Sequence, residues 1–238
     1  MATTLTPHQR ALRSTVALKA LMAVTGLVLI AFLLMHMIGN LKMFIPVYVN
    51  EVGETVNEFN HYAEFLKQDL LYPILPKGVF IWIFRLVILA CLVLHIYSAV
   101  TLWLRANRAT ASKYTVKKTI KQSFSSKWMR WGGILLALLL TWHLIQFTIV
   151  PTLAGDHDPR SLVIAAFQQP LFVAIYVAMM LVVYLHLAHG FGSAFMTLGA
   201  NTSPKAERVL RVIAHWVAAL ILVGFVAMPF SVLAGVIN

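Results

Sequence analysis

Histidines inside apolar segments are the residues of this 238-residue sequence whose chemistry is most informative. An imidazole ring is costly to bury in an apolar environment unless it has a hydrogen-bond partner or binds a metal or cofactor. Of nine histidines, His8, His61 and His157 lie in polar connections, and His215 lies near the start of the last apolar run. The others lie within apolar runs, and they are His36, His95, His143, His186 and His189.

The composition predicts that these histidines lie in a membrane. Hydrophobic residues make up 60% of the chain and charged residues 11%, a balance outside the range of soluble globular domains. The net charge of +11 comes from short basic segments between apolar runs, which is typical of membrane proteins and does not indicate nucleic-acid binding. With a single cysteine, Cys91, the chain can form no internal disulfide, thiolate metal cage or CxxCH haem attachment.

Five apolar runs are each long enough to cross a bilayer as one helix, which takes about 20 residues. They cover about 19–41, 79–104, 129–150, 169–197 and 209–235. The first run is longer than the apolar part of a signal peptide and no small-residue cleavage site follows it, so we expect a retained span. We expect the connections to contain Pro46, Pro73, Pro76, Pro151, Pro159 and Pro204. The prediction is an all-α integral membrane bundle of five transmembrane helices, forming a single domain over 1–238.

The connections alternate in charge. The segment before the first run, the segment 105–130 and the segment before the fifth run are basic, whereas 42–78 is net acidic. Because short basic loops stay in the cytoplasm, we predict a cytoplasmic N-terminus and an external C-terminus. Apolar residues recur at helical spacing over about 55–68, which predicts either an amphipathic helix on the outer interface or an ordinary connecting helix.

The helical rise of 1.5 Å per residue places four of the histidines at two depths. His36 lies about 25 Å and His143 about 21 Å along outward-running spans, so both belong to the outer leaflet. His95 lies about 14 Å and His186 about 15–18 Å from the cytoplasmic ends of inward-running spans, so both belong to the inner leaflet. The sequence therefore predicts an outer pair, His36 with His143, and an inner pair, His95 with His186.

Two imidazoles from facing helices can fill both axial positions of a haem iron. A six-coordinate iron has no open site for oxygen, so two such haems, stacked and enclosed by four of the helices, would conduct electrons. Gly26 and Gly132-Gly133 lie at the inner level, where they would admit the edge of a macrocycle or simply serve helix packing. A single buried histidine more often forms a hydrogen bond or joins a proton relay. Four at matched depths, with no carboxylate inside a span, favour two haems.

His186 and His189 are both candidates for the fourth ligand. They lie three residues apart and nearly share one helical face. We choose His186 because it lies deeper, and His189 could then hydrogen-bond a haem propionate or a quinone.

Five stretches carry a resemblance to a known family. They are KALMAVTGLVLIAFLLMHMIGNL at 19–41, FNHYAEFL at 59–66, LHIYSAVTLWLRANRA at 94–109, SSKWMRWGGILLALLLTWHLIQF at 125–147 and LHLAHGFGSAFMTLG at 185–199. In their order and histidine positions they resemble the single-chain cytochrome b membrane anchor of succinate:quinone oxidoreductases, the succinate dehydrogenase and fumarate reductase family with two haems. The chain departs from the family in having Arg108-Ala109-Thr110 where Arg-Pro often follows Asn-Arg.

The resemblance implies that the haem ligands are His36, His95, His143 and, in an H-x-x-[NH]-G context, His186. It implies two haem b groups and a quinone, for which we expect menaquinone. It also implies two cytoplasmic partner subunits, a flavoprotein that oxidises succinate at covalently bound FAD and an iron–sulfur protein. The chain would then lie in a bacterial cell membrane and pass electrons to the quinone, with no catalytic residue for the carbon chemistry.

Two other functions remain open at this point. One is the cytochrome b anchor of another quinone-linked dehydrogenase, such as a formate dehydrogenase or a hydrogenase. The other is a haem-free transporter or structural membrane protein, which would show no haem absorption. The basic segment 105–130 is either a docking surface for cytoplasmic partners or a solvated loop beside the lipid.

Overall fold

The computed structural model describes residues 14–49, 53, 55–109, 124–155 and 158–238 of the chain. Within these residues, five helices are long and apolar enough to cross a membrane. They are Thr15–Phe44, Val79–Arg108, Trp128–Ala154, Pro170–Thr197 and Pro204–Leu233. The prediction of an all-α membrane bundle is therefore confirmed, and the chain is a multi-pass membrane protein.

The long helices alternate with short elements. The spans are formed by α2 (Thr15–Leu41), α4 (Val79–Ala109), α5 (Phe124–Leu144), α8 (Pro170–Thr197) and α9 (Pro204–Leu233). Between them lie η1 (Lys42–Phe44), β1 (Tyr48–Val49), β2 (Thr55–Val56), α3 (Glu58–Gln68), η2 (Ile145–Ile149), α6 (Val150–Ala154) and α7 (Pro159–Phe167). The strands β1 and β2 pair antiparallel, with Tyr48 opposite Val56.

Helix starts follow local sequence signals. The side chains of Ser14 and Ser203 accept hydrogen bonds from backbone N–H groups in the first turns of α2 and α9, as serine commonly does at a helix start. Pro159, Pro170 and Pro204 each stand in the first turn of a helix, where a residue without an N–H costs little. These signals explain where α2, α7, α8 and α9 begin.

The third span differs from the prediction at Pro151. We expected this proline in a connection, but the span continues through η2, which is a π-helix, and α6 to Ala154. The π turn interrupts the regular hydrogen-bond pattern just before Pro151, so the proline occupies the first turn of a new α-helical segment. Gly155, with φ 70°, then ends the helix in the left-handed conformation.

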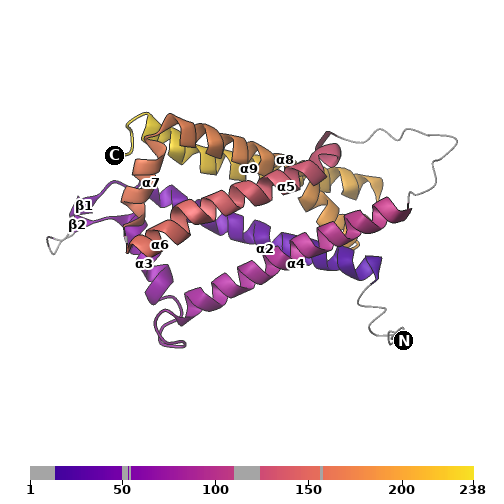
Figure 1. The fold of residues 1–238 in the computed structure, drawn as a ribbon, viewed down its shortest axis with the longest axis horizontal. Helices are drawn as coiled ribbons and strands as arrows, with labels where there is room; N and C mark the ends of the chain where they lie inside the picture. The colour runs from indigo at the N-terminus through magenta and orange to yellow at the C-terminus, as the bar shows by residue number, and fades with distance from the viewer. Residues whose placement is uncertain (1–13, 50–52, 54, 110–123, 156–157) are drawn as a thin grey trace.

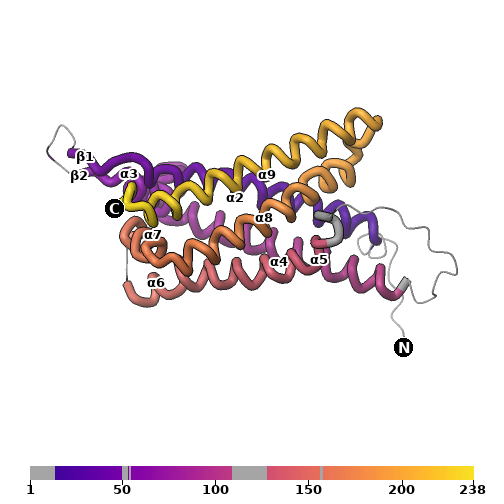
Figure 2. The backbone as a smooth tube through the Cα atoms, turned by 90° about the horizontal axis from the view of Figure 1, so that it is seen from above, coloured from indigo at the N-terminus to yellow at the C-terminus, as the bar shows by residue number. Residues whose placement is uncertain are grey.

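The two ends of the bundle carry different elements (Figure 1). The elements β1, β2, α3 and α7 gather at one end with the C-terminus, and the start of α2 and the end of α4 lie at the other. Seen from above, the same division holds (Figure 2). The expected helix at 55–68 is present as α3, but it begins at Glu58, because 55–56 form β2 and Asn57 caps the helix.

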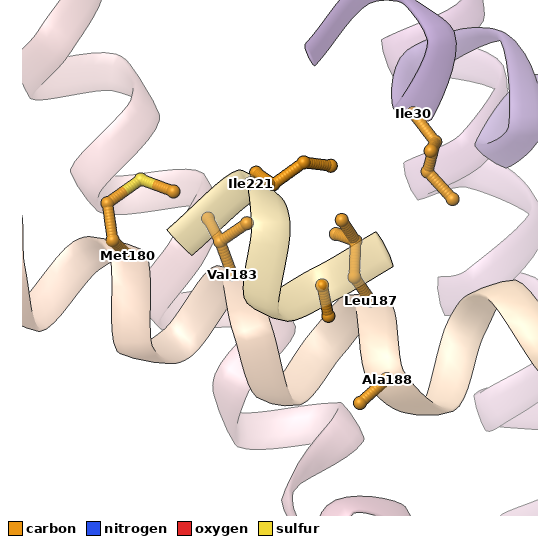
Figure 3. Close-up of a cluster of buried hydrophobic side chains, with 7 residues drawn as sticks. Ile30, Met180, Val183, Leu187, Ala188 and Ile221 are labelled. Carbon is orange, nitrogen blue, oxygen red and sulfur yellow. The ribbon is translucent and has the colours of Figure 1, made fainter. Parts of the chain in front are cut away.

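The core lies where α2, α8 and α9 meet. A cluster of buried residues joins Ile30, Met180, Val183, Leu187, Ala188 and Ile221 across these three helices (Figure 3). The helix α4 packs on α2 and α5 packs on α8, whereas α4 and α5 barely touch. The four helices α2, α4, α5 and α8 therefore form a bundle that lacks close packing between α4 and α5, and α9 packs on the opposite side, against α2 and α8.

Large apolar side chains face outward from the bundle. Trp82, Leu86, Leu138 and Val223 are each more than 60% exposed, an arrangement that water would penalise and a bilayer would favour. The surface thus supports a lipid environment for the five spans.

Hydrogen bonds tie the short elements to the bundle at the end that holds α3. Asn60 donates from Nδ2 to Asp158 (2.6 Å) and accepts from the backbone N–H of Arg160 (3.0 Å). The guanidinium of Arg160, which is 8% exposed, donates to the carbonyl oxygens of Met43 and Asn238. Partial burial acts to raise the pKa of Asp158, but hydrogen bonds from Ser161, Asn60 and two backbone N–H groups outweigh it, so the pKa lies below its usual value.

Gly39 controls the contact between α2 and α3, and this can be tested by substitution. A Cβ atom at Gly39 would lie 2.8 Å from Cε1 of Tyr62, so Gly39→Ala forces the ring of Tyr62 away. We expect a loss of about 1–3 kcal/mol in unfolding free energy, as for other overpacked sites, measured by thermal unfolding in detergent. Gly192→Ala is the control, because its Cβ meets nothing closer than 3.8 Å. Equal stability of the two variants would contradict this packing.

Candidate functional site

The structure brings the four predicted histidines together in two pairs. The rings of His36 on α2 and His143 on α5 have their centres 6.1 Å apart. The rings of His95 on α4 and His186 on α8 have theirs 6.3 Å apart. These are the pairs that helix direction and depth predicted, and His186 rather than His189 is the residue that meets His95. Their role as iron ligands stays a prediction.

The two pairs lie at different levels of the bundle. On α2, Gly26 contacts His95, and on α5, Gly133 lies beside His186. Ten residues separate Gly26 from His36 and Gly133 from His143. Ten residues of helix correspond to about 15 Å, so the pairs are stacked along the bundle axis at that spacing.

Each pair joins helices that do not pack closely on one another. Neither α2 and α5 nor α4 and α8 form a close helix contact, although α2 and α8 do. The histidines therefore reach across the two diagonals of the four-helix bundle. This arrangement places both pairs inside the bundle.

The inner pair has one histidine whose tautomer is set by the backbone. Nδ1 of His95 lies 3.1 Å from the carbonyl oxygen of Met22, and a carbonyl can only accept. Nδ1 therefore carries the proton, and Nε2 keeps its lone pair. This is the tautomer that binds a metal through Nε2. The hydroxyl of Thr25 lies 3.4 Å from the same nitrogen and donates to the carbonyl oxygen of Leu21.

In the outer pair, hydrogen bonds between side chains hold the histidine instead. Nδ1 of His143 lies 3.3 Å from the hydroxyl of Tyr176, which donates to Oε1 of Gln146 at 2.9 Å. Because the tyrosine proton is committed to Gln146, the tyrosine oxygen accepts from Nδ1–H of His143. Nε2 of His143 is thus left with its lone pair, as in His95.

Buried polar atoms at the inner level lack partners within the described residues. They are Nδ1 of His186 and Oγ of Ser98, which lies one turn after His95. Ser98 is fully buried. A buried polar atom without a hydrogen bond costs about 1–3 kcal/mol, and such atoms in a native structure often mark a bound group or an ordered water. They are compatible with a bound group or an ordered water at the inner pair.

Aromatic rings enclose the outer pair. Phe32 stacks on His36 at 5.5 Å between ring centres, and Phe225 approaches the same ring at 5.6 Å. Phe147 lies 5.6 Å from the ring of His143. Among these rings, the histidines sit in a largely apolar and shielded environment.

The geometry suits an iron held by two imidazoles. With a metal–imidazole nitrogen bond of about 2.0–2.1 Å, two rings on opposite sides of one metal have centres about 6 Å apart, as both pairs do. In the described part of the chain, no group of three or more His, Cys, Asp and Glu residues could hold a bare metal ion. A haem brings four ligand nitrogens of its own and needs only two from the protein. The residues therefore fit a haem better than a free metal ion.

Comparisons with protein-family models, curated proteins and solved structures found no match to this chain. A functional assignment therefore depends on the geometry of the two pairs and on the residues that carry the resemblance described above.

Several residues around the pairs were not predicted. Tyr176 and Gln146 flank His143, and Thr25 and the carbonyl of Met22 flank His95. Isolated polar residues inside an apolar span are the signal that could have indicated Thr25, Gln146 and Tyr176. A backbone carbonyl gives no such signal.

The remaining histidines lie elsewhere. His215 on α9 contacts Tyr184 through Nδ1 at 3.1 Å. His61 lies on α3, and His8 and His157 fall outside the described residues, as do parts of the basic segment 105–130.

Gly26 gives a test of the inner pair. A Cβ at this position would lie 3.1 Å from Cε1 and 3.4 Å from Nδ1 of His95, so Gly26→Ala pushes the ring away from the carbonyl of Met22. If the two pairs hold haem, as the resemblance implies, this variant should lose up to half of its haem, as measured by the haem-to-protein ratio. Gly192→Ala, with no contact to either pair, should keep its full content. The same ratio in both variants would show that Gly26 does not position the inner ligand.

Proposed function

We propose that this chain is the cytochrome b membrane anchor of a succinate:quinone oxidoreductase. One haem b would be held by His36 and His143, and a second by His95 and His186. The observation that carries the proposal is the meeting of four imidazoles from four helices in two pairs, each at a ring separation that suits two nitrogen ligands of one iron.

The role of the chain is to hold and shield the two centres. When bound, six-coordinate haems supply one-electron transfer. His95 and His143 present Nε2 because their Nδ1 atoms are engaged elsewhere, and two histidines per iron leave no position for oxygen. The levels, about 15 Å apart by helical rise, form a path along the bundle axis. At its end the chain would deliver electrons to a membrane quinone, for which menaquinone is our expectation.

The proposal includes two cytoplasmic partners, a flavoprotein with covalently bound FAD and an iron–sulfur subunit. Their support is the resemblance, together with the charge at one end of the bundle. That end, where α2 begins, carries Arg105 and Arg108 at the end of α4 and Lys205 and Arg208 at the start of α9. By the positive-inside rule this end would be cytoplasmic and the C-terminus external, and the resemblance implies that the membrane is a bacterial cell membrane.

Single histidine substitutions test the two-haem proposal directly. His95→Ala and His143→Ala each remove a ligand from a different pair, so each variant should lose one of the two haems in its reduced-minus-oxidised spectrum. His215→Ala is the control, because His215 lies in a span but contacts Tyr184 and neither pair. A colourless wild-type protein would contradict the proposal and favour a haem-free transporter or structural protein.

Isolation of the complex tests the choice of dehydrogenase. Purified from its native membrane, the chain should bring with it a subunit with covalent flavin and an iron–sulfur subunit, and the complex should reduce a menaquinone analogue with succinate. Activity with formate or hydrogen in place of succinate would instead identify the anchor of a formate dehydrogenase or a hydrogenase.

A further inference from the structure

The hydrogen-bond chain from His143 through Tyr176 to Gln146 goes beyond what holding an iron requires. We propose that Tyr176 and Gln146 are positioning residues, which fix the tautomer and orientation of His143 and strengthen it as the donor to the outer haem. This inference rests on the proposed function.

The direction of the hydrogen bonds from His143 through Tyr176 follows from the terminal acceptor, Gln146. Oε1 of Gln146 can only accept, so the hydroxyl proton of Tyr176 points toward it at 2.9 Å. The lone pairs of that hydroxyl then face Nδ1 of His143 at 3.3 Å. A proton on Nδ1 is therefore favoured, and a proton on Nε2, which would block metal binding, is disfavoured.

The fold holds the two hydrogen-bonding side chains, Tyr176 and Gln146, in a fixed position. Tyr176 is 9% exposed and packs edge-on against Phe167 and Phe147, with ring centres 5.1 and 5.9 Å away. Gln146 lies one turn after His143, inside the π-helix η2. Short π segments within helices occur often at functional sites, and here the segment carries the terminal acceptor of the chain.

The two sites differ in how their ligands are supported. At the inner site His95 donates to a backbone carbonyl, which no side-chain substitution removes. At the outer site His143 donates to a side chain. A hydrogen bond from the distal N–H makes a ligating imidazole more basic, and a more basic ligand favours the oxidised iron and lowers its potential. The outer site is therefore the one whose potential depends on two replaceable side chains.

The experiment compares Tyr176→Phe and Gln146→Leu with Tyr184→Phe in the complete complex. Tyr184 is on the same helix and contacts Nδ1 of a histidine outside the pairs, His215, so it is a matched control. Tyr176→Phe keeps the ring packing and removes the acceptor, and Gln146→Leu frees the tyrosine proton to point at Nδ1. Loss of such a supporting group typically weakens metal binding by about 10–100-fold.

We expect this weakening at the outer haem alone, together with a higher outer potential in a redox titration. Each tenfold loss that falls only on the oxidised form raises a one-electron potential by about 59 mV. Because Tyr176 and Gln146 act through the same series of hydrogen bonds, the double variant should lose no more outer haem, and shift its potential no further, than Tyr176→Phe alone. The inner haem in every variant, and both haems in Tyr184→Phe, should stay at wild-type values.

Failure of this inference can be separated from failure of the proposed function. Two haems with unchanged potentials in Tyr176→Phe and Gln146→Leu would overturn the positioning role and leave the function standing. A wild-type protein without haem would overturn both. Should Tyr176→Phe lose both haems through misfolding, Gln146→Leu decides, since it leaves the packed ring in place. If the reduction potential of the outer haem alone shifts in Gln146→Leu, the inference is supported. If neither potential shifts in this variant, the inference is overturned.

Discussion

The separation of about 6 Å between paired imidazoles on helices that do not pack closely is the constraint on which the rest of the structure depends. Each pair is only an edge-to-face ring contact, and the two helices that carry it do not pack closely, so the contact alone cannot fix where the rings lie. The bundle must therefore hold them from behind. It does so with a carbonyl of α2 behind His95 and a tyrosine of α8 behind His143.

Rigidity of this kind needs a firm core, and the core is asymmetric. The helices α2, α8 and α9 share the buried cluster around Ile221 and Val183, and α4 and α5 are attached to this unit from either side. The helices α4 and α5 themselves do not pack closely on each other. The absence of Cβ atoms at Gly26 and Gly133 keeps the backbone close to the inner rings. Gly26 and Gly133, which the sequence alone would also explain by ordinary helix packing, thus leave space for the histidine rings at the inner level.

Much of this arrangement was predictable because hydrocarbon leaves few alternatives. Apolar runs had to be helices, and loop charge set their direction, so counting residues along each span placed His36 with His143 and His95 with His186. The rest depended on rotation about helix axes and on local backbone geometry, which hydropathy does not encode. The tyrosine behind His143, the carbonyl behind His95, and the π turn that carries the span past Pro151 all belong to this second class. The choice between His186 and His189 was also rotational, since depth alone hardly separates residues three apart.

Electron paramagnetic resonance of the oxidised wild-type protein, with iron counted per polypeptide, tests the central claim most directly. Two histidines on each iron produce low-spin ferric haem with bis-imidazole ligation, because both axial positions are filled by strong nitrogen ligands. We predict two such signals and two irons per chain. A high-spin signal, one iron per chain, or no iron would contradict the claim that the two histidine pairs are the axial ligands of two haems.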